Sequence, residues 1–520
     1  MGLLDLFGKA QPSQPATVST DTIIPLSFWD GRPYQSGICL EVTYRFDDVL
    51  DVQKLDQSLT RLLQLGDWHK LGARLRRNSA GKLEYHIPRE YTAQRPGFTL
   101  TSEEHPMKAC EHPVASRIPA ATDNPRVLGT ADEILPICRH PQAPQGLDDF
   151  IYTDRPQLTV HVVSFTDTTI LTVTFLHTLM DGMGMASFFT AWTAVLHGQE
   201  DQVPTFLGFD TTPMHILNSN TSAELFVHQG LLLRGFRMLL GIMYFMWDLF
   251  WRGPEEQRVL CITGSFVDQL RNQAIRELAT TTTADIAKSS DPQAPFISES
   301  DVLLAWWTRV VIKALNPAPS RLLCLMNIFD FRSLILPPEH TDPSSNDIAV
   351  IGNATFPAYT FLRVGEILTM PISRLAAQIR QSLVRQRTQP QVEALAALIR
   401  STTEANGVDA TLFGETNSLL MACSNWHKGR LFEIDFSKAV TSVGEQEYTR
   451  TNPVGRPSYL VANASVNGPM PTNLGPVMGK DAGENWWMTW KLPRWAWPMV
   501  EAQVNQVGES MIQSGVKRVQ

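Results

Sequence analysis

The sequence predicts an α/β protein of two domains, each built on a mixed β-sheet with flanking helices. Its 520 residues, of which 43% are hydrophobic and 18% charged, can bury more core than a single domain usually contains. Strand-like runs of β-branched residues interleave with segments of helical periodicity in both halves of the chain. We find no internal repeat of about 20 to 50 residues, the period typical of solenoids.

Changes in composition divide the chain into segments. Residues 11–22 are rich in Pro, Ser and Thr, so residues 1–22 are expected to form a flexible tail. The first domain is then expected over residues 23–198 and the second over residues 259–520. Residues 199–258 form a connector between them.

The clearest secondary-structure signal lies in the first domain. Residues 158–165 and 170–176 are β-branched runs on either side of a polar turn, a pattern typical of a β-hairpin. Residues 186–196 carry apolar side chains at helical spacing. The stretch FLHTLMDGMGM, residues 175–185, therefore lies where a strand ends and a helix begins, with Gly182 and Gly184 in the turn.

The second domain begins with a strong helix signal over residues 297–315, for which Ser298 is a plausible N-cap. Strand-like stretches follow at residues 322–329, 348–356, 431–436 and 486–490.

The connector contains the most apolar segment of the chain, residues 230–253. Arg234, Arg237 and Asp248 interrupt this segment and leave only residues 238–247 free of charge. Ten residues are too few to span a bilayer, which requires ~20 in a helix. Three possibilities remain open for it: a core helix, the cover of a lipophilic pocket, or peripheral membrane contact through residues 230–252.

Charge and cysteine content exclude several classes of function. The net charge of −8 and the lack of a long Lys/Arg block argue against nucleic acid as a partner. The six cysteines are widely spaced, as expected of reduced, mostly buried thiols rather than a zinc site. The N-terminal stretch is a poor secretory signal because Asp5 interrupts its apolar run. A cytoplasmic protein is therefore expected, with membrane association through the connector as the open alternative.

The motif His177-x-x-x-Asp181-Gly182 is the principal candidate for a functional site. Were the segment helical, His177 and Asp181 would share a face as metal ligands do, but no third ligand is apparent, and no metal is predicted. The residues alone allow two interpretations. His177 is either a catalytic histidine at a strand end or a histidine that has only structural hydrogen bonds there.

Several stretches around this motif resemble the BAHD acyltransferases and their fungal relatives, such as the trichothecene acetyltransferases. These families share His-x-x-x-Asp-Gly with chloramphenicol acetyltransferase. The likeness runs in order through IPLSFWD (24–30), LTVTFLHTLMDGMGMASFF (171–189), ISESDVLLAWWTRV (297–310), MNIFDFRSLILPP (326–338), IGNATF (351–356) and SNWHKGRLFEIDFSKA (424–439). It implies two chloramphenicol acetyltransferase-like domains with the active site in a tunnel between them.

The chemistry of such an enzyme suits His177. Acyl transfer from a thioester to an alcohol needs a base for the hydroxyl, and neutral imidazole is available near neutral pH. We therefore predict that His177 is the general base, with no covalent acyl-enzyme, since the chain has no Gly-x-Ser-x-Gly serine elbow.

The resemblance implies roles for the remaining site residues. Asp181 is expected to point away from the reacting centre and to form a structural salt bridge with Arg332. Ser424 and Trp426 are expected near the oxygen that becomes negatively charged. Candidate contacts for coenzyme A are Ser298, Lys428 and Arg430. The implied partners are acyl-CoA, most often acetyl-CoA, as co-substrate and a hydrophobic alcohol acceptor such as a terpenoid, polyketide or alkaloid, bound by a monomer.

One segment departs from the family pattern. The family commonly has Asp-Phe-Gly-Trp-Gly where this chain has Asp435, Phe436, Ser437, Lys438 and Ala439. The departure raises an alternative, in which the fold is retained to cyclise, rearrange or only bind a metabolite. A condensation-type enzyme is disfavoured because Leu176 stands where that group usually has another histidine.

Overall fold

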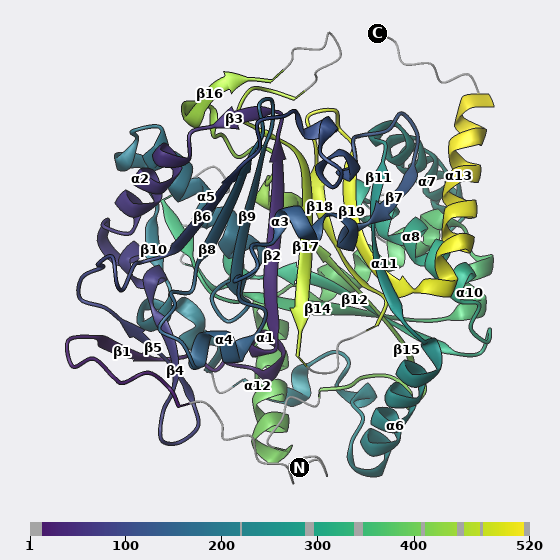
Figure 1. Cartoon of the computed structure of the whole chain (residues 1–520). Helices are drawn as coiled ribbons and strands as arrows, with labels where there is room; N and C mark the ends of the chain where they lie inside the picture. Colours follow the sequence, from purple (N-terminus) through teal and green to yellow (C-terminus); the bar gives the residue numbers. More distant parts are fainter. Residues whose placement is uncertain are drawn as a thin grey trace.

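Two mixed β-sheets lie side by side at the centre of the molecule, and helices cover both (Figure 1). The computed structural model describes residues 13–218, 221–285, 296–336, 347–406, 411–444, 452–467 and 472–513. The architecture is the α/β arrangement of two sheets that the sequence predicts.

The first sheet has five strands, and its centre is the predicted hairpin. In spatial order the strands are β17 (Pro457–Val466), β2 (Ile38–Phe46), β9 (Thr169–Leu176), β8 (Thr159–Ser164) and β6 (Thr99–Glu104). All pairs are antiparallel except β6 with β8. Every residue of β9 is buried, which explains why this strand reads as a continuous run of β-branched and apolar residues.

The second sheet has seven strands and is also mixed. In spatial order they are β14 (Thr355–Arg363), β12 (Leu322–Asp330), β15 (Leu419–Asn425), β18 (Leu474–Lys480), β19 (Trp486–Pro493), β11 (Glu255–Ile262) and β7 (Arg126–Thr130). The pairs β12–β15 and β15–β18 are parallel, and the others are antiparallel.

The sheets cross the domain boundaries predicted from the sequence. Strand β7 comes from residues 23–198 but forms the edge of the second sheet. Strand β17 comes from residues 259–520 but pairs with β2 in the first sheet. Each half of the chain therefore contributes a strand to the sheet of the other half.

Helices pack on these sheets through apolar faces. The long helices are α2 (Val52–Leu62), α5 (Gly182–Leu196), α6 (Gly235–Arg252), α7 (Gly264–Asp285), α8 (Glu299–Leu315), α11 (Ile372–Gln386), α12 (Gln389–Asn406) and α13 (Trp497–Gln513). Helix α5 packs on α2, and α8 packs on α7, α11 and α13. Ser298 caps α8, as predicted, by accepting a hydrogen bond from the backbone N–H of Asp301.

Smaller elements connect these layers. Three minor sheets are β1 (Thr22–Pro25) with β5 (Leu83–Ile87) and β4 (Arg74–Arg77), β10 (Thr205–Leu207) with β13 (Ile348–Val350), and β16 (Val440–Val443) with β3 (Asp48–Leu50). The short helices are α1 (Pro33–Ser36), α3 (Leu135–Cys138), α4 (Leu147–Ile151), α9 (Arg332–Ile335) and α10 (Val364–Thr369).

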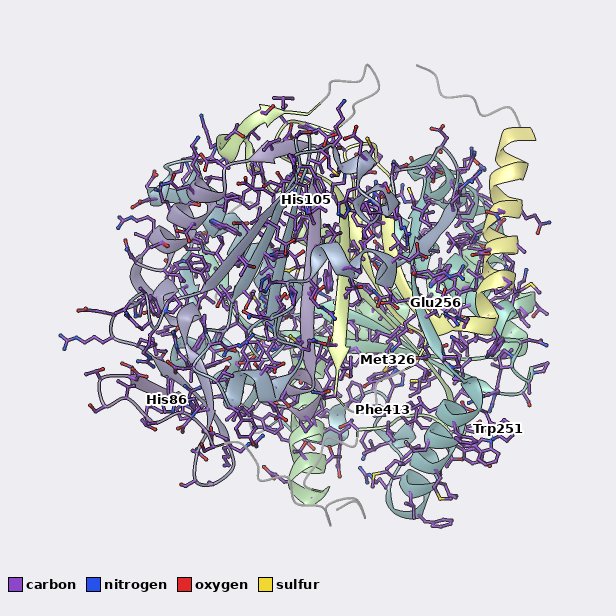
Figure 2. All side chains as sticks on the ribbon, viewed as in Figure 1. His86, His105, Trp251, Glu256, Met326 and Phe413 are labelled. Carbon is purple, nitrogen blue, oxygen red and sulfur yellow. The ribbon has the colours of Figure 1, made fainter. Side chains whose placement is uncertain are left out.

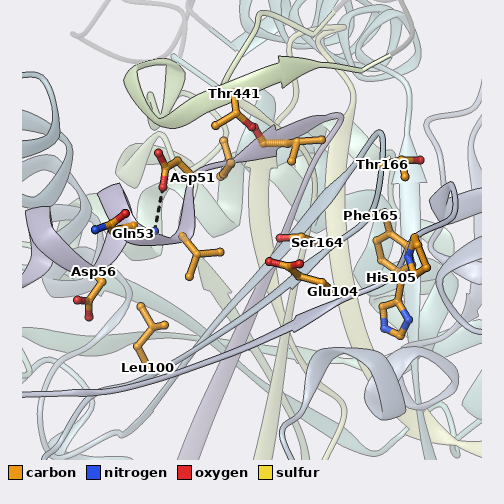
Figure 3. A pocket seen from close by; sticks show the side chains of 14 residues that line it. Asp51, Gln53, Asp56, Leu100, Glu104, His105, Ser164, Phe165, Thr166 and Thr441 are labelled. Atoms are coloured by element: carbon orange, nitrogen blue, oxygen red, sulfur yellow. Dashed lines mark hydrogen bonds between the residues drawn. The ribbon is translucent and has the colours of Figure 1, made fainter.

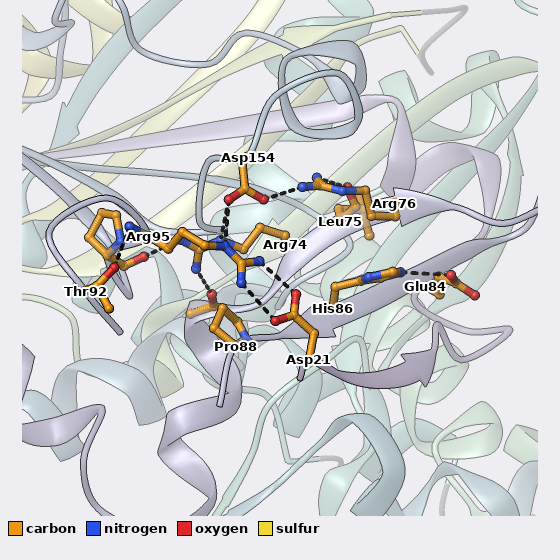
Figure 4. Close-up of polar contacts among 12 residues, drawn as sticks. Asp21, Arg74, Leu75, Arg76, Glu84, His86, Pro88, Thr92, Arg95 and Asp154 are labelled. Atoms are coloured by element: carbon orange, nitrogen blue, oxygen red, sulfur yellow. Dashed lines mark hydrogen bonds and ion pairs between the residues drawn. The ribbon is translucent and has the colours of Figure 1, made fainter. Parts of the chain in front are cut away.

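The part of the predicted flexible tail that the structure describes is bound to the body of the protein. The Gln14 side chain exchanges hydrogen bonds with the backbone of Arg77 at 2.8 and 3.0 Å. The Asp21 carboxylate accepts two hydrogen bonds from Arg95, at 2.7 and 2.8 Å, and Arg95 also pairs with Asp154 (Figure 4). Residues 13–22 therefore do not form a flexible tail, and residues 1–12 lie outside the described residues.

Two further predictions are corrected. The stretch 431–436 is not a strand; it follows Arg430, whose φ of 49° turns the chain, and its apolar side chains enter the first core without pairing. The apolar connector segment forms α6, but it is not a core helix, since Gly241 is its only buried residue. Among the described residues, no helix is long and apolar enough to cross a membrane.

Candidate active site

His177 follows directly after β9, and backbone hydrogen bonds fix its position. Its N–H donates to the carbonyl of Ile38 at 2.9 Å, and its carbonyl accepts from Asn353 Nδ2 at 2.9 Å. The side chain keeps partial exposure, while its Nδ1 is buried and has no hydrogen-bond partner. The imidazole is therefore held at the end of the strand, and the residue is only partly buried.

The environment keeps this imidazole neutral. Burial lowers the pKa of His177 below its ordinary value of 6.5, because a charged imidazolium would lose hydration there. The histidine's own carbonyl and the Asp181 carboxylate oppose this shift only in part. A neutral His177 can accept a proton near neutral pH.

Asp181 is fully engaged by groups other than His177. It is the N-cap of α5, and its Oδ1 accepts from the N–H groups of Met183 at 3.0 Å and Gly184 at 2.9 Å. Arg332 donates to both carboxylate oxygens, at 2.8 and 3.1 Å, and Ala354 N–H donates to Oδ2 at 2.9 Å. Asp181 therefore orients the turn that follows His177, defined here as residues 177–184 and called the motif turn.

Electrostatics agree with this arrangement. Burial alone would raise the pKa of Asp181, but Arg332 and the backbone N–H groups overcome that effect and hold the pKa below its ordinary value. Arg332 itself is buried and also pairs with Asp330 at 2.7 Å. The ion pair joins the end of β9 to the end of β12, which lie in different sheets.

A second buried network supports the backbone of His177. Asn353 Nδ2 donates to Asp30 Oδ1 at 2.9 Å as well as to the His177 carbonyl, and Asn353 N–H donates to the same Asp30 oxygen at 2.7 Å. Ser27 donates to the other oxygen of Asp30. Both IPLSFWD and IGNATF are part of the family resemblance, but no local pattern in either stretch predicts that Asp30 and Asn353 meet.

The second half of the chain contacts the motif turn through Trp426. Its Nε1 donates to Ser424 Oγ at 2.9 Å. The same indole lies so close to Gly182 that a Cβ there would come within 2.8 Å of Nε1. Gly182 is therefore required by close packing against Trp426, and Trp426 in turn holds Ser424. The expected place of Ser424 and Trp426 near the reacting oxygen stays a prediction.

The three candidate coenzyme A contacts differ in their surroundings. Ser298 Oγ donates to Asp301 in the cap of α8 at 2.7 Å, so its hydroxyl hydrogen is already used. Arg430 is paired with Glu433. Lys428 lies in the turn after β15, which packs on α5, and burial together with nearby Arg387 lowers its pKa. Lys428 thus lies near charged side chains of both signs, Arg387, Asp330 and Arg380, which the sequence did not reveal.

Tyr34 is another residue that the sequence did not single out. Its ring centroid lies 6.2 Å from that of His177, and the side chain is exposed. It adds an aromatic surface beside the imidazole. Within the part of the chain that the structure describes, no three His, Cys, Asp or Glu side chains are grouped as a metal site would require.

Comparison with known proteins assigns the family. The model of the Transferase family matches residues 148–447, which include the motif turn and Trp426. The chain belongs to the Transferase family. It is an acyltransferase of the BAHD type.

Curated relatives of this acyltransferase match almost its whole length. Acetyltransferase adrJ of Penicillium rubens is 41% identical over 520 residues, 98% of this chain and 100% of the relative. O-acyltransferase pboC of Aspergillus ustus is 38% identical and covers 89% of this chain and 94% of its own. A protein of Penicillium decumbens named transcriptional regulator calD is 36% identical over 97% of this chain and 99% of its own.

Solved structures share the fold. TRI101 of F. sporotrichioides, crystallised with coenzyme A and T-2, superposes with a TM-score of 0.61 at 16% identity, over 93% of this chain and 98% of that chain. Vinorine synthase superposes with a TM-score of 0.56 at 13% identity, over 96% of both chains. The acyltransferase therefore has the two-domain fold of the chloramphenicol acetyltransferase-like enzymes.

A surface cavity of about 910 Å³ lies apart from the motif turn (Figure 3). Its lining includes Asp51, Glu104, His105 and Ser164, but neither His177 nor Trp426. The Asp51 carboxylate is already used as the N-cap of α2. The tunnel expected between the two halves of the acyltransferase stays a prediction.

Replacing Asp181 with Ala should destabilise the acyltransferase by about 3–5 kcal/mol, because Arg332 is left as a buried charge without its main partner. The free energy of unfolding from urea titration measures this loss, and kcat should fall with it. The double variant Asp181→Ala/Arg332→Met is the control, and it should be more stable than Asp181→Ala alone. An Asp181→Ala variant that unfolds at the wild-type urea concentration but is inactive would contradict the structural role.

Proposed function

We propose that this acyltransferase transfers an acyl group, most often acetyl, from acyl-CoA to a hydroxyl of a hydrophobic secondary metabolite. The observation that carries the proposal is the neutral, partly exposed imidazole of His177 in a turn that packs against Trp426 of the second half, whose indole donates to Ser424. In this proposal His177 is the base for the acceptor hydroxyl, and Ser424 donates to the oxygen that becomes negatively charged.

The proposed reaction proceeds without a covalent enzyme intermediate. His177 removes the proton of the acceptor hydroxyl as that oxygen attacks the thioester carbonyl, which forms a tetrahedral intermediate. The carbon–sulfur bond of this intermediate then breaks, and the proton passes from His177 to the thiolate. The products are the ester and free coenzyme A, and His177 returns to its neutral form.

Ser424 is the proposed donor to the oxyanion of that intermediate. Trp426 donates its indole N–H to Ser424 Oγ, which leaves the hydroxyl hydrogen of Ser424 as the donor of the pair. The hydrogen bond fixes the Oγ atom, so the hydroxyl is positioned before reaction starts. Such positioned donors are worth about 10²–10³ in turnover.

Coenzyme A is the proposed acyl carrier. The related TRI101 structures of F. sporotrichioides and F. graminearum contain coenzyme A. In this chain, Lys428 lies near Arg387, Arg380 and Asp330, and its ammonium group is the proposed contact to a phosphate of the cofactor. Arg430 is the weaker candidate because Glu433 already pairs with it.

A hydrophobic alcohol is the proposed acceptor. TRI101 was crystallised with the mycotoxin T-2, which supports an acceptor of this kind by likeness of fold. Tyr34 beside His177 offers an apolar ring against which such a molecule could stack.

The segment that departs from the family pattern gives no support to a repurposed fold. Phe436 is fully buried and packs on Phe46, Phe189 and Trp192 in the first core. Asp435 accepts a hydrogen bond from Ser437 N–H and lies beside His197. Among the altered residues, Ala439 is buried in the first core, and the Lys438 carbonyl accepts a hydrogen bond from Lys54 of α2 at 3.1 Å. The departure therefore changes packing beside α2 rather than the motif turn.

The purified protein should release free thiol from acetyl-CoA when incubated with a panel of hydroxylated terpenoids, polyketides and alkaloids. His177→Ala should reduce this rate by at least about 10²-fold, because it removes the base. His197→Ala, a histidine outside the site, is the matched control and should keep most of the activity. Binding of free coenzyme A without thiol release from any donor would favour the repurposed fold.

The rate should depend on pH in a way that reports the His177 pKa. Because burial lowers this pKa below 6.5, His177 stays neutral to more acidic pH than a free histidine does. We expect kcat/KM to be constant near neutral pH and to fall with a pKa below 6.5 as the solution is acidified. A pH profile whose acidic limb lies above pH 6.5 would contradict the assignment.

Lys428→Ala should raise the KM for acetyl-CoA about tenfold and leave kcat nearly unchanged, because a charged contact to phosphate is lost. The control substrate is acetyl-pantetheine, which carries the same thioester without phosphates and should not distinguish the variant from wild type. Equal effects of Lys428→Ala on both donors would show that Lys428 does not bind phosphate.

A further inference from the structure

We propose that helix α6 docks this acyltransferase on anionic membrane surfaces. Six large apolar side chains follow one another along the solvent side of α6 at helical spacing, and we call this side the outer face. They are Phe236, Leu239, Met243, Trp247, Phe250 and Trp251. All six are exposed, with Phe250 at 78% and Trp251 at 65%. An exposed apolar patch of this extent marks an interaction site.

Two charged residues in the C-terminal part of α6, Asp248 and Arg252, point the other way. Asp248 pairs with Arg321 on the body of the protein, and Arg252 Nη1 donates to Asn473 Oδ1 at 2.8 Å. Gly241 packs closely on Leu233. A helix at a water interface normally turns its charged side chains outward and its apolar stripe inward. Helix α6 does the reverse, so its outer face suits an apolar environment.

The charge of the helix favours anionic lipid over a second copy of the chain. Arg234 at its N-cap and Arg237 in its first turn are both exposed. Together with Arg252 and Asp248, they give the helix three arginines and one aspartate, although the whole chain carries −8. Two copies meeting through this face would bring like charges together, whereas anionic headgroups would attract them.

The aromatic residues match the chemistry of the lipid headgroup region. Trp247 and Trp251 are in contact with each other and both are exposed, and Figure 2 shows Trp251 at the outer edge of the molecule. Trp495 continues the surface, since it is half exposed and its Nε1 donates to the carbonyl of Arg252 at 3.0 Å. Tryptophan is enriched at membrane–water interfaces because its ring is apolar and its N–H is polar.

Docking through α6 leaves the motif turn free. Strand β12 separates the two regions. Arg321, immediately before β12, pairs with Asp248 of α6. Arg332, shortly after β12, pairs with Asp181 of the motif turn. A strand of this length spans about 30 Å. The outer face of α6 and the motif turn therefore lie at opposite ends of the second sheet.

Co-sedimentation of the full-length protein with vesicles tests the proposal. The protein should bind vesicles of 70% phosphatidylcholine and 30% phosphatidylserine, and it should bind pure phosphatidylcholine more weakly. The double variant Phe250→Ser/Trp251→Ser should lower the partition coefficient at least about tenfold, because two aromatic rings no longer enter the interface. Arg234→Glu/Arg237→Glu should abolish the preference for phosphatidylserine.

Val384→Ser is the matched control, since Val384 is an exposed apolar residue of α11, away from α6, and the variant should bind vesicles as wild type does. Thiol release in vesicle-free buffer should be unchanged in all of these variants. Wild-type protein that stays in the supernatant with both vesicle compositions would overturn the proposal. So would a wild-type dimer in light scattering that Phe250→Ser/Trp251→Ser converts to a monomer, because the outer face would then be a contact between copies.

Discussion

The buried ion pair between Asp181 and Arg332 is the interaction on which the geometry of the active site depends. It links the turn after β9 in the first sheet to the end of β12 in the second sheet. Both partners are buried, so water cannot solvate one charge when the other is removed. Arg332 also donates to the carbonyls of Val350 and Gly352, which draws the Gly352–Asn353 backbone towards the motif turn. This ion pair thus holds the turn that carries His177, and it also joins the second half of the chain to the first.

Much of the fold followed from local patterns, because β-branched runs and helical periodicity report burial directly. The β8–β9 hairpin, the helix capped by Ser298 and the strand β19 all formed where these patterns indicated. The strand exchange could not be predicted, since strand pairing between residues 38–46 and 457–466 leaves no local signal. The stretch 431–436 has the composition of a strand. Its apolar side chains are buried, as that composition indicates, but its backbone pairs with no strand that the structure describes.

The candidate site was predictable where the chain resembles a known family and was not predictable where it depends on distant contacts. His177, Asp181 and Arg332 were assigned from the motif and its resemblance. The Asp30–Asn353 network was missed, because it joins residues 323 positions apart in the sequence. Arg387 and Arg380 were missed for the same reason, since they lie on or next to α11 and become neighbours of Lys428 only in the folded protein.

The exchange of β7 and β17 has a consequence for the order in which the protein can be assembled. Strand β2 pairs with β17, which ends at residue 466 of 520. During synthesis on the ribosome, the first sheet must therefore wait with one open edge until most of the chain has emerged. An unpaired edge of this kind is a template for contacts with other chains. The first sheet therefore cannot be completed by the first half of the chain, nor the second sheet by the second half.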